Sequence, residues 1–139
     1  MNSVLVIGSG CREAIIVRKL LDDSKKLGIS LNVICIGSNK HPFIKENCEL
    51  HILKKYYEID FTRIVNNIKN LKFCVVGPEA FLEEGVADVL KKRNIPCIGP
   101  LKNYARIETS KSYAREIINA CGLENHSPKY VLLEKNEFE

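Results

Sequence analysis

Ser3-Val-Leu-Val-Ile-Gly-Ser-Gly-Cys-Arg-Glu13 is the stretch that decides the fold. Its apolar run, Val4–Ile7, is uninterrupted and rich in β-branched residues, which is typical of a strand buried on both faces of a parallel sheet. Gly8 ends that run, and a helix is expected from about Arg12, with Gly28 as its C-terminal stop. A buried strand, a glycine-rich turn and a helix form the first unit of an α/β domain.

The same alternation of strand and helix continues along the chain. We expect further strands at Leu31–Ile36, Glu49–Leu53, Phe73–Gly77, Ile95–Gly99 and Lys129–Leu133. We expect further helices at His41–Asn47, from a cap at Asp60 to Leu71, at Ala80–Arg93, at Leu101–Ile107 and at Ser110–Ala120. Such an order predicts an α/β fold with a doubly wound, mainly parallel sheet and helices on both faces, in the Rossmann-like manner.

Composition narrows the class of protein. The chain has 139 residues, of which 45% are hydrophobic and 27% charged, enough for one core that needs no metal or disulfide. The net charge of +4 is small and scattered, so no nucleic-acid partner is expected. No apolar stretch approaches the length of a membrane span, and no signal peptide is visible after Met1. We therefore expect a cytoplasmic protein without a membrane partner.

The six cysteines indicate free thiols in a reducing compartment. No two of them form a Cys-x-x-Cys pair, and no histidine stands at ligand spacing from a cysteine, so no metal site is expected. Cys35, Cys74 and Cys97 lie within apolar runs, where cysteine behaves as a small core residue.

Gly8, Ser9, Gly10, Cys11, Arg12 and Glu13 form the loop with the clearest chemical potential. Glycines let a backbone approach an anion, the helix N-terminus offers free N–H groups, and Arg12 can add a bidentate phosphate contact. The dinucleotide fingerprint requires glycine where Glu13 stands and an acid after the second strand, so a nicotinamide cofactor is disfavoured. Phosphate binding is favoured over a turn that only packs the helix on the sheet.

Gly77, Pro78 and Glu79 follow the fourth expected strand, which in a doubly wound sheet usually lies beside the first. Glu79 would then face the glycine-rich loop, where a carboxylate can accept hydrogen bonds from two ribose hydroxyls. Glu79 can equally cap the helix expected from Ala80. The sequence leaves these two interpretations open.

Four motifs together resemble a known family: Val4–Glu13, Val75–Ala80, Ile98–Pro100 and Glu108–Lys111. In this order and spacing they resemble the N-terminal, pre-ATP-grasp domain of phosphoribosylamine–glycine ligase, also called glycinamide ribonucleotide synthetase. The resemblance implies a Rossmann-like domain at 1–108, with 109–139 as a helix and a strand that begin an ATP-grasp domain otherwise absent.

The resemblance also implies an activity, an ATP-dependent ligation of glycine to phosphoribosylamine in purine biosynthesis. It implies a small phosphorylated ribosyl ligand, with its phosphate near Gly8, Gly10 and Arg12 and its ribose near Glu79. Lys111 matches the family lysine that contacts ATP. ATP and Mg²⁺ belong to the whole enzyme, and this chain is expected to carry no catalytic residue and no metal ligand of its own.

Two departures from the family pattern lie on the proposed substrate side. In the first, Cys11 stands where the family usually has a further glycine, and Ala14-Ile15 stands where it has His-Ala. In the second, Ile36-Gly-Ser-Asn39 stands where the family normally has a Pro-Gly-Asn turn. Three functions therefore stay open: one piece of a ligase that needs a partner chain carrying the ATP-grasp domain, a stand-alone phosphoribosyl- or nucleotide-binding module, and an interaction protein with a vacant crevice. An unpaired strand at Tyr130–Leu133 would pair with a second copy, giving a homodimer, or fold back onto the sheet edge, unless the tail is disordered.

Overall fold

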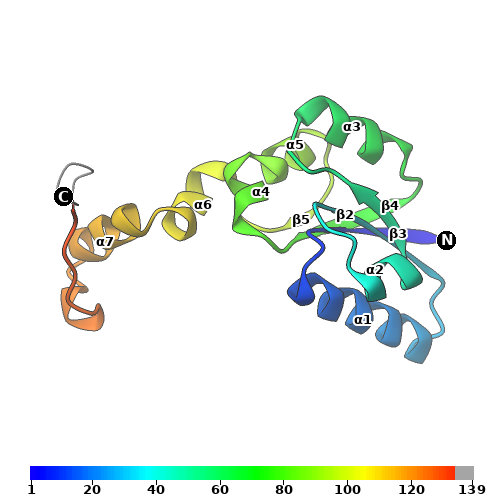
Figure 1. The fold of residues 1–139 in the computed structure, drawn as a ribbon, viewed down its shortest axis with the longest axis horizontal. Coiled ribbons are helices and arrows are strands. Elements are labelled where there is room, and N and C mark those ends of the chain that lie inside the picture. Colours follow the sequence, from blue (N-terminus) through cyan, green and yellow to red (C-terminus); the bar gives the residue numbers. More distant parts are fainter. Residues whose placement is uncertain (134–139) are drawn as a thin grey trace.

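The structure, a computed structural model, describes residues 1–133 and centres on a five-stranded sheet of order β3-β2-β1-β4-β5 (Figure 1). The strands are β1 (Asn2–Ile7), β2 (Leu31–Gly37), β3 (Glu49–Ile52), β4 (Leu71–Val76) and β5 (Cys97–Ile98). All their pairings are parallel, and β1 lies between β2 and β4 with its last five residues buried. The expected doubly wound parallel sheet is confirmed.

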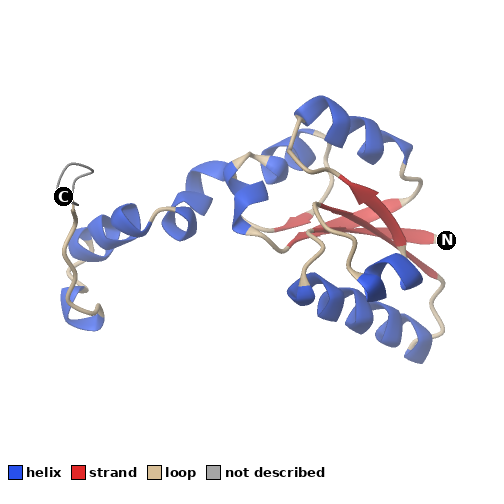
Figure 2. Cartoon of the chain, in the orientation of Figure 1, coloured by secondary structure: helices blue, strands red, loops and turns tan. Residues whose placement is uncertain are grey.

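Helices cover both faces of this sheet (Figure 2). They are α1 (Cys11–Lys26), α2 (Pro42–Asn47), α3 (Glu58–Asn67), α4 (Glu79–Glu83), α5 (Val86–Lys92), α6 (Lys102–Thr109) and α7 (Lys111–Ala120), followed by a 3₁₀ turn, η1 (Glu124–His126). Successive residues of a strand point to opposite faces. Leu5 of β1 therefore enters the core beneath α3 and α5, and the next residue, Val6, enters the core beneath α1 and α2.

The segment after β4 forms two helices where the sequence predicted one over Ala80–Arg93. Gly85 interrupts it with φ +87°, a left-handed conformation that an α-helix cannot contain. The apolar spacing continues across the break, because both α4 and α5 bury their inner sides against the same body. That continuity is why periodicity alone did not reveal the interruption.

Other predicted boundaries were wrong by a few residues. The helix predicted from a cap at Asp60 begins at Glu58 with Tyr57 as its N-cap, and it ends at Asn67. Leu71, which matched the helical spacing, opens β4 after a turn in which Asn70 has φ 53°. Leu71 therefore continued the helical spacing of α3 although it is the first residue of a strand. The strand predicted at Ile95–Gly99 is paired only over Cys97–Ile98.

The α6–α7 segment extends away from the body as an arm (Figure 1). Ala105 anchors α6 against Leu82 and Ala87, whereas α7 buries none of its residues. No strand forms at Lys129–Leu133, which corrects the prediction. The segment instead returns along α7, where Asn119 Nδ2 donates to Tyr130 Oη at 2.9 Å. A strand needs a neighbouring strand, and the described chain brings none to this place; the polar end over 134–139 lies outside the described residues.

Candidate functional site

The loops that follow β1, β2 and β4 meet at the carboxyl edge of the sheet. They enclose a crevice of about 450 Å³ lined by Gly8, Ser9, Gly10, Cys11, Arg12, Glu13, Ser38, Asn39, Pro78, Glu79, Ala80 and Phe81. β1 and β4 are neighbours, as the sequence predicted, so the glycine-rich loop and Glu79 do face one another. In parallel α/β sheets this edge, at the point where strand order reverses, is the usual place of a ligand.

The glycine-rich loop presents the N-terminus of α1 to the crevice. Gly10 is the N-cap, with extended backbone, and the helix begins at Cys11. The N–H groups of the first helical turn have no partner within the helix, and the helix dipole makes this end electropositive. Gly10 N–H is already engaged, because it donates to Glu13 Oε2 at 2.7 Å. The remaining N–H groups are suited to an anion.

Glu13 lies beneath the loop as a buried carboxylate, with a relative exposure of 3%. Its Oε1 has no hydrogen-bond partner among the described residues. A Cβ on Gly77 would stand 2.1 Å from Oε1, and a Cβ on Gly8 would stand 2.7 Å from the Glu13 carboxyl carbon. The two glycines therefore make room for this carboxylate, which fills the place where a dinucleotide loop would have its third glycine.

Arg12 and Glu79 face each other across the crevice. The distance from Arg12 Nη2 to Glu79 Oε2 is 3.8 Å, and Arg12 Nε lies 3.6 Å from Glu13 Oε1. The Arg12 and Glu79 side chains are 62% and 52% exposed, so their ion pair contributes only ~0–1 kcal/mol. So weak a pair can open to a ligand at little cost. Glu79 is the first residue of α4 and Pro78 is its N-cap, so Glu79 does not cap this helix.

The turn after β2 closes the third side of the crevice. Asn39 N–H donates to Ser9 Oγ at 2.9 Å, and Ser9 is buried. A Cβ on Gly37 would stand 2.3 Å from Ser9 Oγ, so this glycine permits the two loops to touch. The sequence placed the turn with Ser38 and Asn39 on the substrate side only through the family resemblance, and it did not place Ala80 or Phe81 in the site. The available signal was that Ser38 and Asn39 follow the strand beside β1.

The structure separates two of the expected residues from the others. Gly77 does not line the crevice but lies behind it, against Glu13. Lys111 lies exposed at the start of α7, on the arm, so its expected contact with ATP stays a prediction. Among residues 1–133, no group of three or more histidine, cysteine or acidic side chains is placed to hold a metal ion. Nor does any helix in that range have the length and apolar character needed to cross a membrane.

A doubly wound parallel sheet with a glycine-rich loop and a carboxylate at its switch point defines the class of Rossmann-like α/β domains. Residues 2–108 match the family model described as "Phosphoribosylglycinamide synthetase, N domain". The chain therefore belongs to this family, and its resemblance to the N-terminal domain of the ligase is confirmed.

Curated relatives agree with the family. Phosphoribosylamine–glycine ligase of Methanosarcina barkeri is 35% identical over 127 residues, which are 91% of this chain and 28% of that protein. The ligase of Methanocella arvoryzae is 36% identical over 117 residues, 83% of this chain and 26% of that protein. The bifunctional purine biosynthetic protein purD of Dictyostelium discoideum is 35% identical over 119 residues, 84% of this chain and 14% of that protein. The chain thus spans less than a third of the length of these relatives.

Among solved structures, a universal stress protein from Archaeoglobus fulgidus aligns with a TM-score of 0.39 and 17% identity, over 70% of this chain and 92% of that one. So distant a likeness carries no functional argument.

Proposed function

We propose that this chain is the substrate-binding part of a phosphoribosylamine–glycine ligase. Its ligand is a small phosphorylated ribosyl compound held in the crevice between the glycine-rich loop and Glu79. The observation that carries the proposal is the meeting, at one sheet edge, of the α1 N-terminus, Arg12 and Glu79, in a chain whose residues 2–108 belong to the synthetase N-domain family.

The chemistry of the lining residues supports this ligand class. Free N–H groups at the start of α1 and the guanidinium of Arg12 suit the oxygens of one phosphate. Arg12 is the one cation among the lining residues, so the site matches a single phosphate better than a chain of them. Glu79, freed from Arg12, can accept hydrogen bonds from ribose hydroxyls.

The same proposal assigns the ATP-dependent step to the part of the relatives that these 139 residues do not cover. Activating the carboxylate of glycine needs ATP with Mg²⁺, and the curated relatives are more than three times as long as this chain. We propose that an ATP-grasp partner supplies that chemistry, and that Lys111 on the arm contributes to the nucleotide site at the junction. The proposal includes a cytoplasmic location.

One observation favours a second candidate. α7 buries none of its residues, and Tyr130, Val131, Leu132 and Leu133 are each at least 40% exposed. A binding module or interaction protein without catalysis would also present such a surface to its partner. The ligase part and the interaction protein differ in whether the crevice binds a ligand, because the interaction protein would leave it empty.

Isothermal titration with ribose 5-phosphate and with glycinamide ribonucleotide tests the proposal directly. We expect binding that Arg12→Ala weakens about tenfold or more, because a charge-assisted hydrogen bond contributes about 1.5–3 kcal/mol. Glu79→Ala should weaken both ribosyl ligands and leave the weak binding of inorganic phosphate unchanged.

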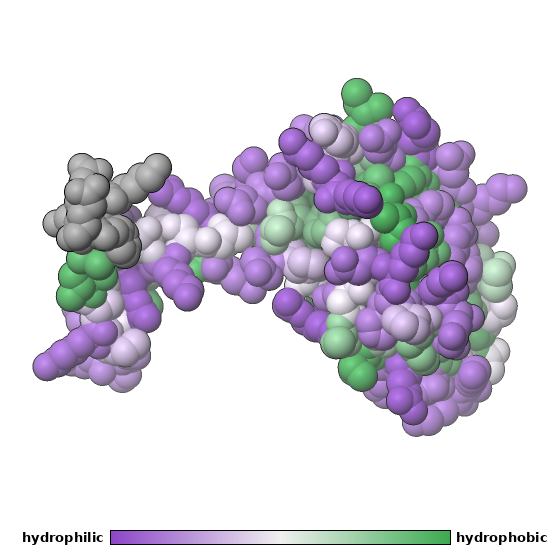
Figure 3. Space-filling view, viewed as in Figure 1, coloured by the Kyte–Doolittle hydropathy of each residue, from purple (hydrophilic) through white to green (hydrophobic). Residues whose placement is uncertain are grey.

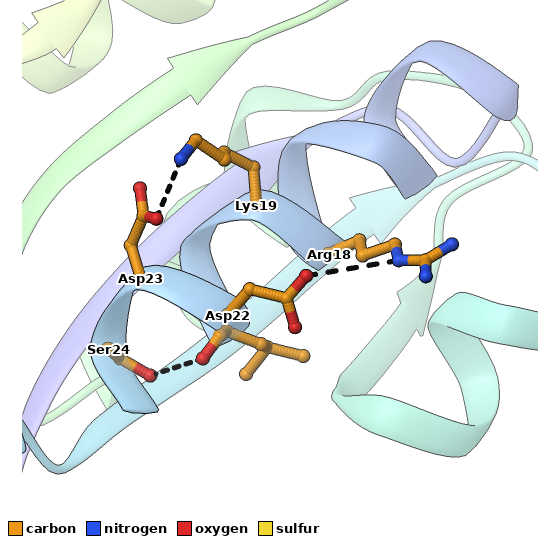
Figure 4. Close-up of polar contacts among 6 residues, drawn as sticks. Arg18, Lys19, Asp22, Asp23 and Ser24 are labelled. Carbon is orange, nitrogen blue, oxygen red and sulfur yellow. Dashed lines mark hydrogen bonds and ion pairs between the residues drawn. The ribbon is translucent and has the colours of Figure 1, made fainter. Parts of the chain in front are cut away.

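Matched controls come from the same two helices. Arg18 pairs with Asp22 on the exposed side of α1 at 3.9 Å (Figure 4), and Glu83 lies exposed on α4. Arg18→Ala and Glu83→Ala should leave the affinity unchanged. Absence of heat with either ribosyl ligand, or equal losses in the Arg12 and Arg18 variants, would contradict the proposal and leave the interaction protein as the better account.

A further inference from the structure

Two cysteines distant from any sequence motif meet beside the crevice loops. Cys35, in β2, is fully buried, and Cys48, immediately after α2, is half-buried. Their Sγ atoms are 3.6 Å apart. They are 13 positions apart in the sequence, so no local spacing pattern marks them as a pair.

The geometry lies within reach of a covalent bond. A disulfide has an S–S length of about 2.05 Å, so from 3.6 Å the sulfurs must approach by about 1.5 Å. Cys35 is held inside the sheet, whereas Cys48 follows a helix of only six residues at the C-cap position. Rotation of the Cys48 side chain, with a small adjustment of the end of α2, can supply the approach without disturbing β2.

We propose that Cys35 and Cys48 form a reversible redox site that is oxidised by low-molecular-weight disulfides such as glutathione disulfide. The Cys48 thiolate attacks one sulfur of the small disulfide, forming a mixed disulfide and releasing one thiolate. Cys35, giving up its proton, then attacks Cys48 Sγ, the mixed disulfide breaks, and the second small thiol leaves. Two protein thiols are oxidised and one small disulfide is reduced to two thiols.

The electrostatics of the pair support this division of roles. A hydrogen bond from the Cys35 thiol lowers the pKa of Cys48, because it stabilises the Cys48 thiolate. The same bond and burial raise the pKa of Cys35, which keeps its proton until the second step. Burial of Cys48 acts in the opposite direction, so it is a moderate nucleophile and not a highly activated one.

The bond would bear on the crevice through the segment that it closes. Ser38 and Asn39 lie between the two cysteines and line the crevice, and the Asn39 backbone N–H donates a hydrogen bond to Ser9 Oγ. β2 and β3 already hold the two ends of this segment, since Cys48 directly precedes β3, and the disulfide would add a covalent restraint at the end of α2. Oxidation should therefore restrain the loop opposite Arg12.

A second pair of cysteines provides an internal comparison. Cys74 of β4 and Cys97 of β5 are direct partners in the parallel ladder. Their thiols also interact, since burial and a hydrogen bond to Cys97 raise the pKa of Cys74, and the same bond lowers the pKa of Cys97. Both cysteines are held in paired strands of the sheet, whereas Cys48 lies outside the sheet at the end of a six-residue helix. They should stay reduced under conditions that join Cys35 to Cys48.

Peptide mapping of the full chain tests the proposal. The protein is equilibrated with glutathione and glutathione disulfide, quenched in acid, alkylated and digested with trypsin. Cleavage after Lys26, Lys40, Lys45 and Lys54 places Cys35 in the peptide 27–40 and Cys48 in the peptide 46–54. We expect these two peptides to appear joined in the monomer and to separate on treatment with dithiothreitol. The oxidised protein should also melt several degrees higher, because the bond constrains the unfolded chain.

Two variants test which cysteine attacks in the first step and which in the second. Cys48→Ser should abolish the joined peptide and leave Cys35 unmodified, whereas Cys35→Ala should accumulate glutathione on Cys48. If Cys35→Ala fails to fold, the wild-type map and the Cys48→Ser variant still decide. Glutathione on the exposed Cys11 and Cys121 without a 35–48 link, or a 74–97 link in its place, would overturn the proposal.

Discussion

Glu13 is the residue around which the crevice is built, although the dinucleotide fingerprint counts it as a mismatch. Its carboxylate fixes Gly10 N–H and occupies the space that Gly8 and Gly77 leave free. Gly77 is not among the glycines with positive φ, so alanine there meets a steric conflict and no backbone strain. The three atoms nearest to a methyl group at position 77 would all belong to Glu13.

Gly77→Ala should lower the free energy of unfolding by about 2 kcal/mol, the usual cost of overpacking a buried site. The methyl group would stand 2.1 Å from Glu13 Oε1. In a Glu13→Ala background the same substitution should cost less than about 0.5 kcal/mol, because the conflict is gone. Urea denaturation of the four proteins of this double-mutant cycle measures both values.

Gly28→Ala is the control for that cycle. Gly28 has φ +63°, and a Cβ added there would meet no atom within 4 Å, so its substitution acts through the backbone conformation. Its cost, about 1 kcal/mol, should be the same with and without Glu13. If Gly77→Ala lowers the free energy of unfolding equally with and without Glu13, the carboxylate does not set the spacing between the loops after β1 and β4.

At the scale of elements, α6 depends on a cap supplied by another helix. Leu101, its N-cap residue, has no polar side chain, and Lys102 N–H donates instead to Asp88 Oδ2 of α5 at 2.8 Å. Asp88→Ala should cost about 1 kcal/mol and speed hydrogen exchange in the first turn of α6. Asp88→Asn retains an acceptor, so it should lower the free energy of unfolding by less than half as much as Asp88→Ala.

Asp22→Ala is the matched control, because Asp22 makes only an exposed pair within α1 (Figure 4). It should change the free energy of unfolding by no more than about 0.5 kcal/mol. Equal effects at positions 88 and 22, or unchanged exchange in α6, would show that Asp88 does not hold the base of the arm.

The sequence predicted most elements because their signals are local. β1 and β2 are apolar runs that end at glycine, and Gly28 ends α1 with the expected positive φ. The interruption at Gly85 was missed because both helices bury the same side. The turn after β2 was placed on the substrate side only through the family resemblance, because only the pairing of β1 with β2 brings Ser9 to Asn39. The proximity of Cys35 and Cys48 likewise depends on how α2 packs, which no spacing rule encodes.

At the scale of the whole molecule, we expect the body to fold without the end of the chain. α7 buries no residue, and its contacts with α6 include Arg106 over the Tyr113 ring, with 4.1 Å from Cζ to the ring centroid. Deleting residues 111–139 should therefore change the free energy of unfolding by less than about 1 kcal/mol, because no core side chain is lost.

Urea denaturation of the truncated chain, with sedimentation equilibrium of both forms, measures the effect. An unchanged midpoint would support our proposal of a Rossmann-like body over 1–108 and a separate segment over 109–139. A loss of cooperative unfolding would contradict it. A dimer that the truncation dissolves would assign the exposed residues Tyr130–Leu133 and α7 to contact between two copies.

The arm also governs how the molecule moves through solvent (Figure 3). A globular body with a narrow projection experiences more translational friction than a sphere of the same mass, 15.8 kDa. Its rotation about the long axis is faster than its end-over-end tumbling. α7 and β1 both run roughly along that axis (Figure 1). Because the N–H bonds of a helix lie along its axis and those of a strand lie across it, nuclear spin relaxation would report the two elements as tumbling at different rates even where both are rigid.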